Sequence, residues 1–180
     1  MKKTLITITI ALALVATLGG VAYAATGITD PQVLQDLAAV RQATVKYHDV
    51  EVALAGGFIR TPHCIEEPGL GGMGIHFINP ARIMNPAINF LEPEILLYLE
   101  TNGTMKLIGV EYMFPIGRPD GPIPNPAPPA PVLLGRAFVG PMLGHEPGMP
   151  PHYDFHVWVW EANPAGIFTP FNPNVSCPQV

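Results

Sequence analysis

The chain contains very little serine, cysteine and charge, and each shortage excludes a class of function. Ser176 is its only serine and has no Gly-x-Ser-x-Gly motif around it, which argues against a serine hydrolase. Only 9 of the 180 residues are Lys or Arg, against 14 that are Asp or Glu. Because a nucleic-acid-binding surface needs clustered basic residues and none are clustered here, nucleic acid is not an expected partner.

The N-terminus has the pattern of a secretory signal peptide. Lys2 and Lys3 precede a long apolar run, and Ala22-Tyr23-Ala24 has small residues where a signal peptidase recognises them. We therefore predict residues 1–24 as the signal peptide and 25–180 as one extracytoplasmic domain, secreted or periplasmic; an uncleaved anchor is the alternative. Loss of the two lysines leaves 7 basic and 14 acidic residues, so the mature chain is not expected to bind an anionic membrane surface.

Cys64 and Cys177 are the only cysteines, and export would place them where thiols oxidise. We predict that they form a disulfide bond. The bond would close a loop of roughly 110 residues, which the chain-entropy model values at about 4–5 kcal/mol. The alternative, a pair of thiolate metal ligands, lacks the Cys-x-x-Cys spacing of a zinc site.

The beginning of the predicted domain has the signals of two helices. Asp30-Pro31 is a good helix start, and apolar residues follow it at helical spacing to about Lys46. A shorter helix is predicted at Val50–Ala55, where Gly56-Gly57 would end it because glycine accepts the positive φ of a C-terminal cap.

The rest of the domain is predicted to be strands and turns. Residues 95–101 and 104–112 flank Asn102-Gly103, the preferred turn of a two-residue hairpin. If the residues beside this turn pair and the register continues unbroken, Glu94 lies opposite Glu111. Further strands are expected at residues 73–78, around 132–143, and at 152–160, whereas 115–131 has eight prolines in seventeen residues and is predicted to be an extended surface loop.

These elements indicate a single α+β domain. We expect the N-terminal helix to pack on a curved antiparallel β-sheet of about four to six strands, or on a partly closed barrel. An all-β sandwich or a cupin-like barrel is the alternative.

The most distinctive segment runs from His152 to Trp160. Strand alternation places His152, Asp154 and His156 on one face and aromatic or apolar residues on the other. Imidazoles and a carboxylate on one face are typical of proton-transfer or metal-binding sites.

We hypothesise one cavity that binds a divalent transition metal such as zinc, copper, iron or manganese. Its ligands would come from three strands and are His76, Glu111, His152 and His156. Cupin barrels use a comparable set, but their His-x-His run is replaced here by His-x-x-x-His. Hydrogen-bonded structural histidines are the alternative.

Two other functions stay open. A small-molecule-binding module would use the flat side chains of Tyr98, Tyr112 and Trp158 as a pocket for an organic ligand. A structural or interaction protein at the cell surface would need no pocket at all. The sequence names no reaction, so enzymatic activity is not predicted in either direction.

Several segments together resemble a family of secreted microbial proteins whose activity is uncharacterised. The resemblance covers nearly all of the predicted mature chain and implies no particular fold, activity or cofactor. Its segments are Lys46-Tyr47-His48-Asp49, Gly72-Met73-Gly74-Ile75-His76, Gly109-Val110-Glu111-Tyr112, His156-Val157-Trp158-Val159-Trp160 and Asn172-Pro173-Asn174-Val175-Ser176-Cys177.

Overall fold

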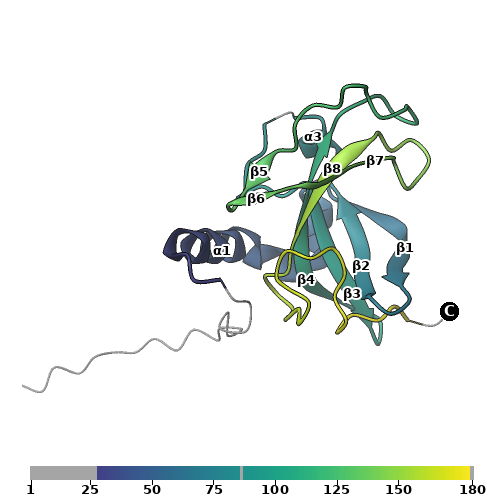
Figure 1. The fold of residues 1–180 in the computed structure, drawn as a ribbon. Helices are drawn as coiled ribbons and strands as arrows, with labels where there is room; N and C mark the ends of the chain where they lie inside the picture. The colour runs from purple at the N-terminus through teal and green to yellow at the C-terminus, as the bar shows by residue number, and fades with distance from the viewer. Residues whose placement is uncertain (1–27, 86, 179–180) are drawn as a thin grey trace, which may run out of the picture.

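The computed structural model describes residues 28–85 and 87–178, and it confirms an α+β fold (Figure 1). The signal peptide predicted for residues 1–24 lies outside this part of the chain. Within the described part, no helix has the length and hydrophobicity needed to cross a membrane.

Two helices and a 3-10 turn form the N-terminal part. Helix α1 spans Pro31–Thr44 and continues as the turn η2 (Val45–His48), so the regular helix ends slightly before the predicted position. Helix α2 spans Val50–Ala55 as predicted, and Gly57 after it has a φ of 86°. Asp30 and Asp49 cap the two helices because each carboxylate accepts a hydrogen bond from a backbone N–H two residues later.

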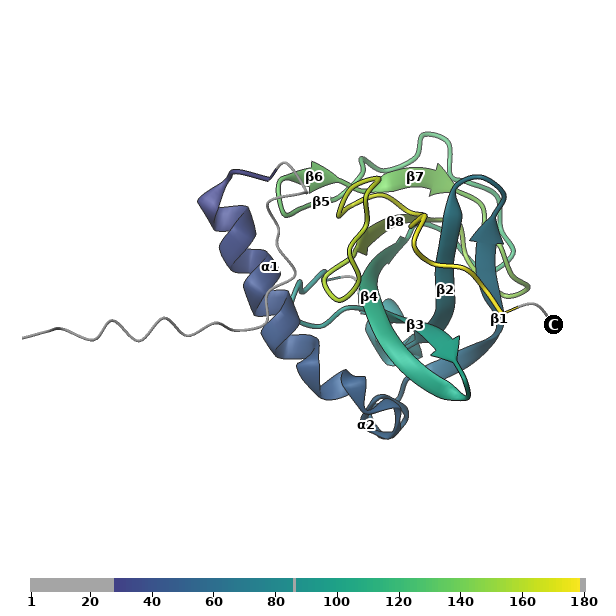
Figure 2. The ribbon, with the colours of Figure 1, turned by 90° about the horizontal axis from the view of Figure 1, so that it is seen from below.

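Six antiparallel strands form one sheet in the order β1-β2-β3-β4-β8-β7, and the sheet curls into a half-barrel (Figure 2). The helices lie outside this half-barrel. A short helix, α3 (Pro80–Ile83), follows β2, and a separate two-stranded sheet pairs β5 (Val132–Leu133) with β6 (Arg136–Ala137). The six strands are β1 (Ile59–Glu67), β2 (Gly71–Ile78), β3 (Ile95–Thr101), β4 (Thr104–Pro115), β7 (Val139–Met142) and β8 (His152–Val157).

The convex face of the sheet packs against the helices. The Tyr98 hydroxyl on β3 donates a hydrogen bond to the Tyr47 carbonyl of η2, and the Phe77 ring lies 4.6 Å from the Tyr98 ring. All three of these residues are buried. Since neighbouring residues in a strand face opposite sides, residues that alternate with Phe77 and Tyr98 point into the half-barrel.

The β3–β4 hairpin has the predicted turn but a different register. Asn102 and Gly103 have φ angles of 51° and 74°, as a type I′ turn requires. A bulge between Leu97 and Tyr98 then shifts the pairing by one residue, so that Ile95 is opposite Glu111. The prediction that Glu94 lies opposite Glu111 is therefore wrong.

Strand β8 is shorter than predicted. It ends at Val157, because the backbone N–H of Trp158 bonds to the Ile167 carbonyl of the C-terminal tail and not to a strand. The region 132–143 likewise forms three short strands, β5, β6 and β7, where a single one was predicted. Residues 116–131 connect β4 to β5 without regular secondary structure.

The predicted disulfide bond between Cys64 and Cys177 is confirmed. Cys64 lies on β1 directly opposite Ile75 of β2, so the bond attaches the C-terminal tail beside the strand that carries His76. The backbone N–H of Cys177 also donates to the Glu66 carboxylate at 2.7 Å. The bond indicates an oxidising, extracytoplasmic environment.

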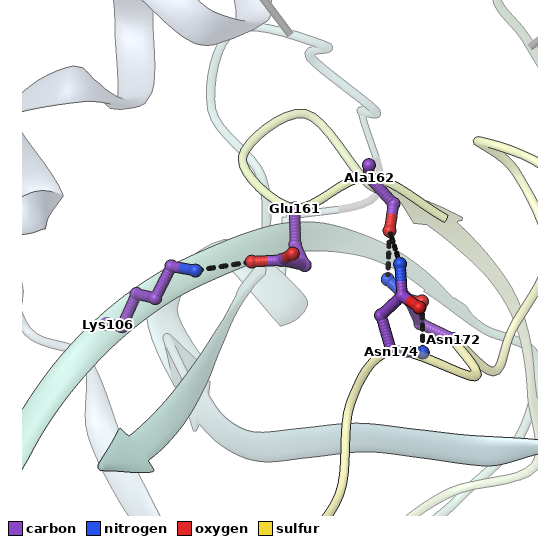
Figure 3. Close-up of polar contacts among 5 residues, drawn as sticks. All are labelled: Lys106, Glu161, Ala162, Asn172 and Asn174. Carbon is purple, nitrogen blue, oxygen red and sulfur yellow. Dashed lines mark hydrogen bonds and ion pairs between the residues drawn. The ribbon is translucent and has the colours of Figure 1, made fainter. Parts of the chain in front are cut away.

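Side-chain amides also hold the C-terminal tail in place (Figure 3). Asn172 and Asn174 both donate from their side chains to the Ala162 carbonyl, at 3.2 and 3.0 Å. The Asn172 side-chain oxygen accepts the backbone N–H of Asn174 at 2.9 Å. Beside this cluster, Lys106 of β4 forms an ion pair with Glu161.

Candidate metal site

Three of the four predicted metal ligands meet inside the half-barrel. His76 comes from β2, Glu111 from β4 and His156 from β8. In its own strand, each of the three residues is flanked by residues that point to the convex face. All three side chains therefore project to the concave side. Glu111 and His156 are direct cross-strand partners, which fixes their side chains next to each other.

The ligand atoms have the spacing of a metal site. Glu111 Oε2 lies 3.1 Å from His76 Nε2 and 3.5 Å from His156 Nε2. One ligand atom from each residue lies within 4.8 Å of the others. Tetrahedral ligands at metal distances of 2.0–2.1 Å are about 3.3 Å apart. The two measured separations lie on either side of that value.

Several buried polar atoms in this cluster have no hydrogen-bond partner among the described residues. They include both ring nitrogens of His156 and also Glu111 Oε2, whose contacts with the two imidazole nitrogens are close in distance but lack hydrogen-bond geometry. The Glu111 and His156 side chains are 5% and 1% exposed, whereas His76 is 14% exposed and forms the outer side of the cluster. Unpaired buried polar atoms are costly, so their convergence on one point indicates a site for a bound ion.

The surroundings of Glu111 favour the charge state that metal binding requires. Burial disfavours the ionised form of Glu111, but the imidazoles of His156 and His76 outweigh it and hold the pKa of this carboxyl below its ordinary range. Burial lowers the pKa of His156, although the Glu111 carboxylate opposes this. These neighbours therefore favour the ionised form of Glu111, which is the form of a carboxyl group that binds metals.

Asp154 lies on the same face of β8, between the two histidines of that strand. It is buried, and its Oδ1 has no hydrogen-bond partner in the described part of the chain. Burial, assisted by the Glu111 carboxylate, raises the pKa of Asp154 well above its ordinary value. The sequence placed Asp154 on this face but did not include it among the site residues.

His152, the fourth predicted ligand, lies outside the group of three. It is 1% exposed, and its Nδ1 contacts the Pro150 carbonyl at 3.0 Å while its Nε2 has no partner in the described residues. Because it is four residues before His156 on β8, it lies further along the same face of the strand. The structure thus assembles three of the four ligands into one cluster.

The aromatic residues predicted to line a ligand pocket belong to the core. Tyr98, Tyr112 and Trp158 are at most 2% exposed. The Tyr112 hydroxyl donates to the Phe90 carbonyl, and Trp158 Nε1 donates to the Thr169 carbonyl at 2.6 Å. Their polar atoms are therefore occupied, and the aromatic-pocket function stays an alternative without support from these positions.

An open groove of about 390 Å³ lies on the other side of β8. Phe155, which points away from His156, is part of its lining together with Arg136 and residues 165–169. None of the three cluster residues lines this groove, so the groove and the polar cluster are separate features of the molecule.

Comparison with family models, with curated proteins and with solved structures found no match to this chain. The resemblance to an uncharacterised secreted family therefore stays a prediction. The functional inference depends on the geometry of the cluster alone.

Proposed function

We propose that this chain is an extracytoplasmic protein that binds one divalent transition-metal ion through His76, Glu111 and His156. The observation that carries the proposal is that ligand atoms from three strands lie at metal-ligand spacing, and that those of Glu111 and His156 are buried without hydrogen-bond partners. The disulfide bond and the N-terminal signal pattern support the proposed compartment.

The donor set favours some metals over others. Two imidazoles and one carboxylate suit zinc, copper, iron and manganese, whereas calcium and magnesium prefer oxygen ligands alone. Three protein ligands also leave at least one coordination position open, as in catalytic zinc sites and in iron centres with two histidines and one carboxylate. A water molecule or a small substrate would bind at that position.

The proposal is tested by measuring metal content. Protein purified without a histidine tag, stripped with a chelator and reloaded with zinc or cobalt(II), is analysed by elemental mass spectrometry and by the visible spectrum of the cobalt form. We expect one metal per chain, and its loss in His76→Ala and His156→Ala. His63→Ala is the matched control, because His63 is an exposed histidine on β1.

Two results would overturn the proposal. The first is folded wild-type protein that retains no metal after reloading. The second is metal binding that survives in both His76→Ala and His156→Ala as it does in His63→Ala. If the two variants only lower the melting temperature, the histidines are structural.

A further inference from the structure

The segment that joins β7 to β8 lies at the edge of the sheet (Figure 1), and histidines and methionines are grouped along it. Neither the group of three ligands nor the proposed function includes these residues. We call this group the edge cluster, and its members are Met142, His145, Met149 and His152.

His152 presents a nitrogen that is ready to bind a metal. Its Nδ1 lies 3.0 Å from the Pro150 carbonyl, which can only accept a hydrogen bond. The hydrogen of the neutral ring is therefore on Nδ1, and Nε2 carries the lone pair. Nε2 is buried and has no partner among the described residues. A histidine whose other nitrogen is fixed by a carbonyl is the usual form of a metal ligand.

His145 provides a second imidazole on the solvent side. Its ring centre lies 5.3 Å from that of His152, with the two planes at 71°. His145 is exposed, whereas His152 is buried. An ion bound between the two rings could thus enter directly from solvent.

Two thioethers lie beside these imidazoles. Met149 Sδ accepts a hydrogen bond from the backbone N–H of His145 at 3.4 Å, which places the sulfur beside the backbone of that residue. Met142 is the direct cross-strand partner of His152 in the β7–β8 pair, so both side chains project to the same face. Both methionines are partly buried.

The loop that carries these residues is held in shape by several contacts. The backbone N–H of Gly148 donates to the Asp120 carboxylate at 2.8 Å, and that of Met149 donates to the Glu146 carbonyl at 3.0 Å. A Cβ atom at Gly144 would lie 2.2 Å from the Met149 carbonyl oxygen, so the loop closes tightly on itself. The backbone that carries the donor side chains is therefore held in one shape.

We propose that the edge cluster is a second metal site and that the ion it binds is monovalent copper, Cu(I). Thioether sulfur and imidazole nitrogen are soft or intermediate donors that suit Cu(I), and the edge cluster itself contributes no carboxylate. The group of three ligands differs from the edge cluster in containing the carboxylate of Glu111, and for this reason it suits divalent ions. The two sites use different residues, so this proposal does not depend on the proposed function.

The test is an anaerobic titration of the full chain with Cu(I) buffered by a chromogenic chelator. We expect the double variant Met142→Leu/Met149→Leu to weaken Cu(I) binding by at least about tenfold. This is the smaller end of the loss in affinity that follows when residues supporting a metal site are replaced. Leucine conserves the volume of methionine, so the variant is expected to fold. Met84→Leu is the control, because Met84 is 82% exposed and lies outside the cluster.

A second measurement tests the sulfur ligands directly. Ag(I), a soft and redox-inert substitute for Cu(I), should shift the methyl NMR signals of Met142 and Met149 but not that of Met84. His145→Ala should weaken Cu(I) binding, and Glu111→Gln should leave it unchanged while it abolishes binding of cobalt(II).

Equal Cu(I) affinity in the double variant and in Met84→Leu would overturn the proposal. An X-ray absorption spectrum of the Cu(I) complex without sulfur in the first coordination shell would do the same. Loss of Cu(I) binding in Glu111→Gln would assign the ion to the group of three ligands and also count against the edge cluster.

Discussion

Glu111 and His156 are opposite each other in the β4–β8 pair, and Glu111 Oε2 lies 3.5 Å from His156 Nε2. The pairing keeps the carboxylate within reach of the ion that we propose His156 binds. Glu111 is then the residue whose charge matters most, because it is the single anion among the three proposed ligands.

We expect Glu111→Gln to abolish stabilisation by metal. An ion at a hundredfold excess over its Kd stabilises the folded protein by about 2.7 kcal/mol, which raises the melting temperature. The glutamine side chain keeps the shape but removes the charge, so zinc should no longer raise the melting temperature. Glu67→Gln, at an exposed end of β1, is the control. An unchanged zinc response in Glu111→Gln would contradict the prediction.

Glu94 is expected to make stability depend on pH. Burial raises its pKa from 4.5 to about 7, although the backbone N–H of Met113 and the charge of Arg82 oppose this. The pKa of Glu94 is higher in the folded than in the unfolded protein, so its protonated carboxyl contributes to stability. This contribution is complete below pH 4.5 and is lost as the pH rises through 7.

In Glu94→Gln this contribution no longer varies with pH. The free energy of unfolding of the wild type should therefore fall relative to that of Glu94→Gln, by on the order of 2–3 kcal/mol between pH 4.5 and 8. Denaturant unfolding across this range measures the difference. Glu92→Gln, at an exposed position nearby, is the matched control. Parallel pH profiles for the wild type and Glu94→Gln would refute the assignment.

Removal of the disulfide bond should destabilise the fold strongly. The bond joins residues separated by 113 positions. The chain-entropy model predicts a loss of about 4–5 kcal/mol for Cys64→Ala/Cys177→Ala. Denaturant unfolding with and without reductant measures it, because reductant should destabilise the wild type and leave the variant unchanged. A loss below about 1 kcal/mol would mean that the unfolded chain is already compact.

Local signals predicted much of the fold. The cap at Asp30, the bounds of α2 and the turn at Asn102-Gly103 depend on neighbouring residues alone, and the structure has all of them. Strand alternation likewise placed His76 and His156 correctly, because each lies in a regularly paired strand.

Features that depend on tertiary contacts were not predictable in the same way. Strand β1 was not predicted; it contains Pro62, which its position at the edge of the sheet tolerates because an edge strand has unpaired backbone groups. The bulge beside Leu97 has no clear sequence signal, and it moved Glu94 away from Glu111. The edge cluster was missed because only the closed β7–β8 loop brings Met149 next to His145.

Gly74 should tolerate no side chain. The backbone of the neighbouring strand lies very close to it: an added Cβ would be 2.5 Å from the Tyr98 carbonyl oxygen. Gly74 also has a φ of 89°.

We expect Gly74→Ala to destabilise the fold more than Gly103→Ala, its control. Gly103 has a similar φ of 74°, but nothing lies within 4 Å of its added Cβ. The positive φ costs roughly 1–2 kcal/mol of backbone strain in both variants. The additional loss of stability in Gly74→Ala therefore measures the steric overlap of the new Cβ with the Tyr98 carbonyl. Equal melting temperatures for the two variants would contradict this prediction. They would mean that β2 can move away from β3 to make room for the new Cβ without a loss of stability.

Asn172 should contribute more to stability than the neighbouring ion pair between Lys106 and Glu161 (Figure 3). Asn172 is fully buried, and its side chain both donates to the Ala162 carbonyl and accepts from the Asn174 backbone. Asn172→Ala would leave the backbone N–H of Asn174 without its partner and would remove one of the two donors to the Ala162 carbonyl, a loss of about 1–3 kcal/mol.

Lys106→Met is the variant with which Asn172→Ala is compared, because it removes a surface ion pair and leaves the hydrogen bonds of Asn172 in place. The Lys106 side chain is 54% exposed, and ion pairs of this kind contribute about 0–1 kcal/mol. Urea unfolding of both variants should therefore give a clearly larger loss for Asn172→Ala. Because the tail is also held by the disulfide bond, the measurement is made on the oxidised protein. An equal or smaller loss in Asn172→Ala would mean that the disulfide bond alone holds the tail in place.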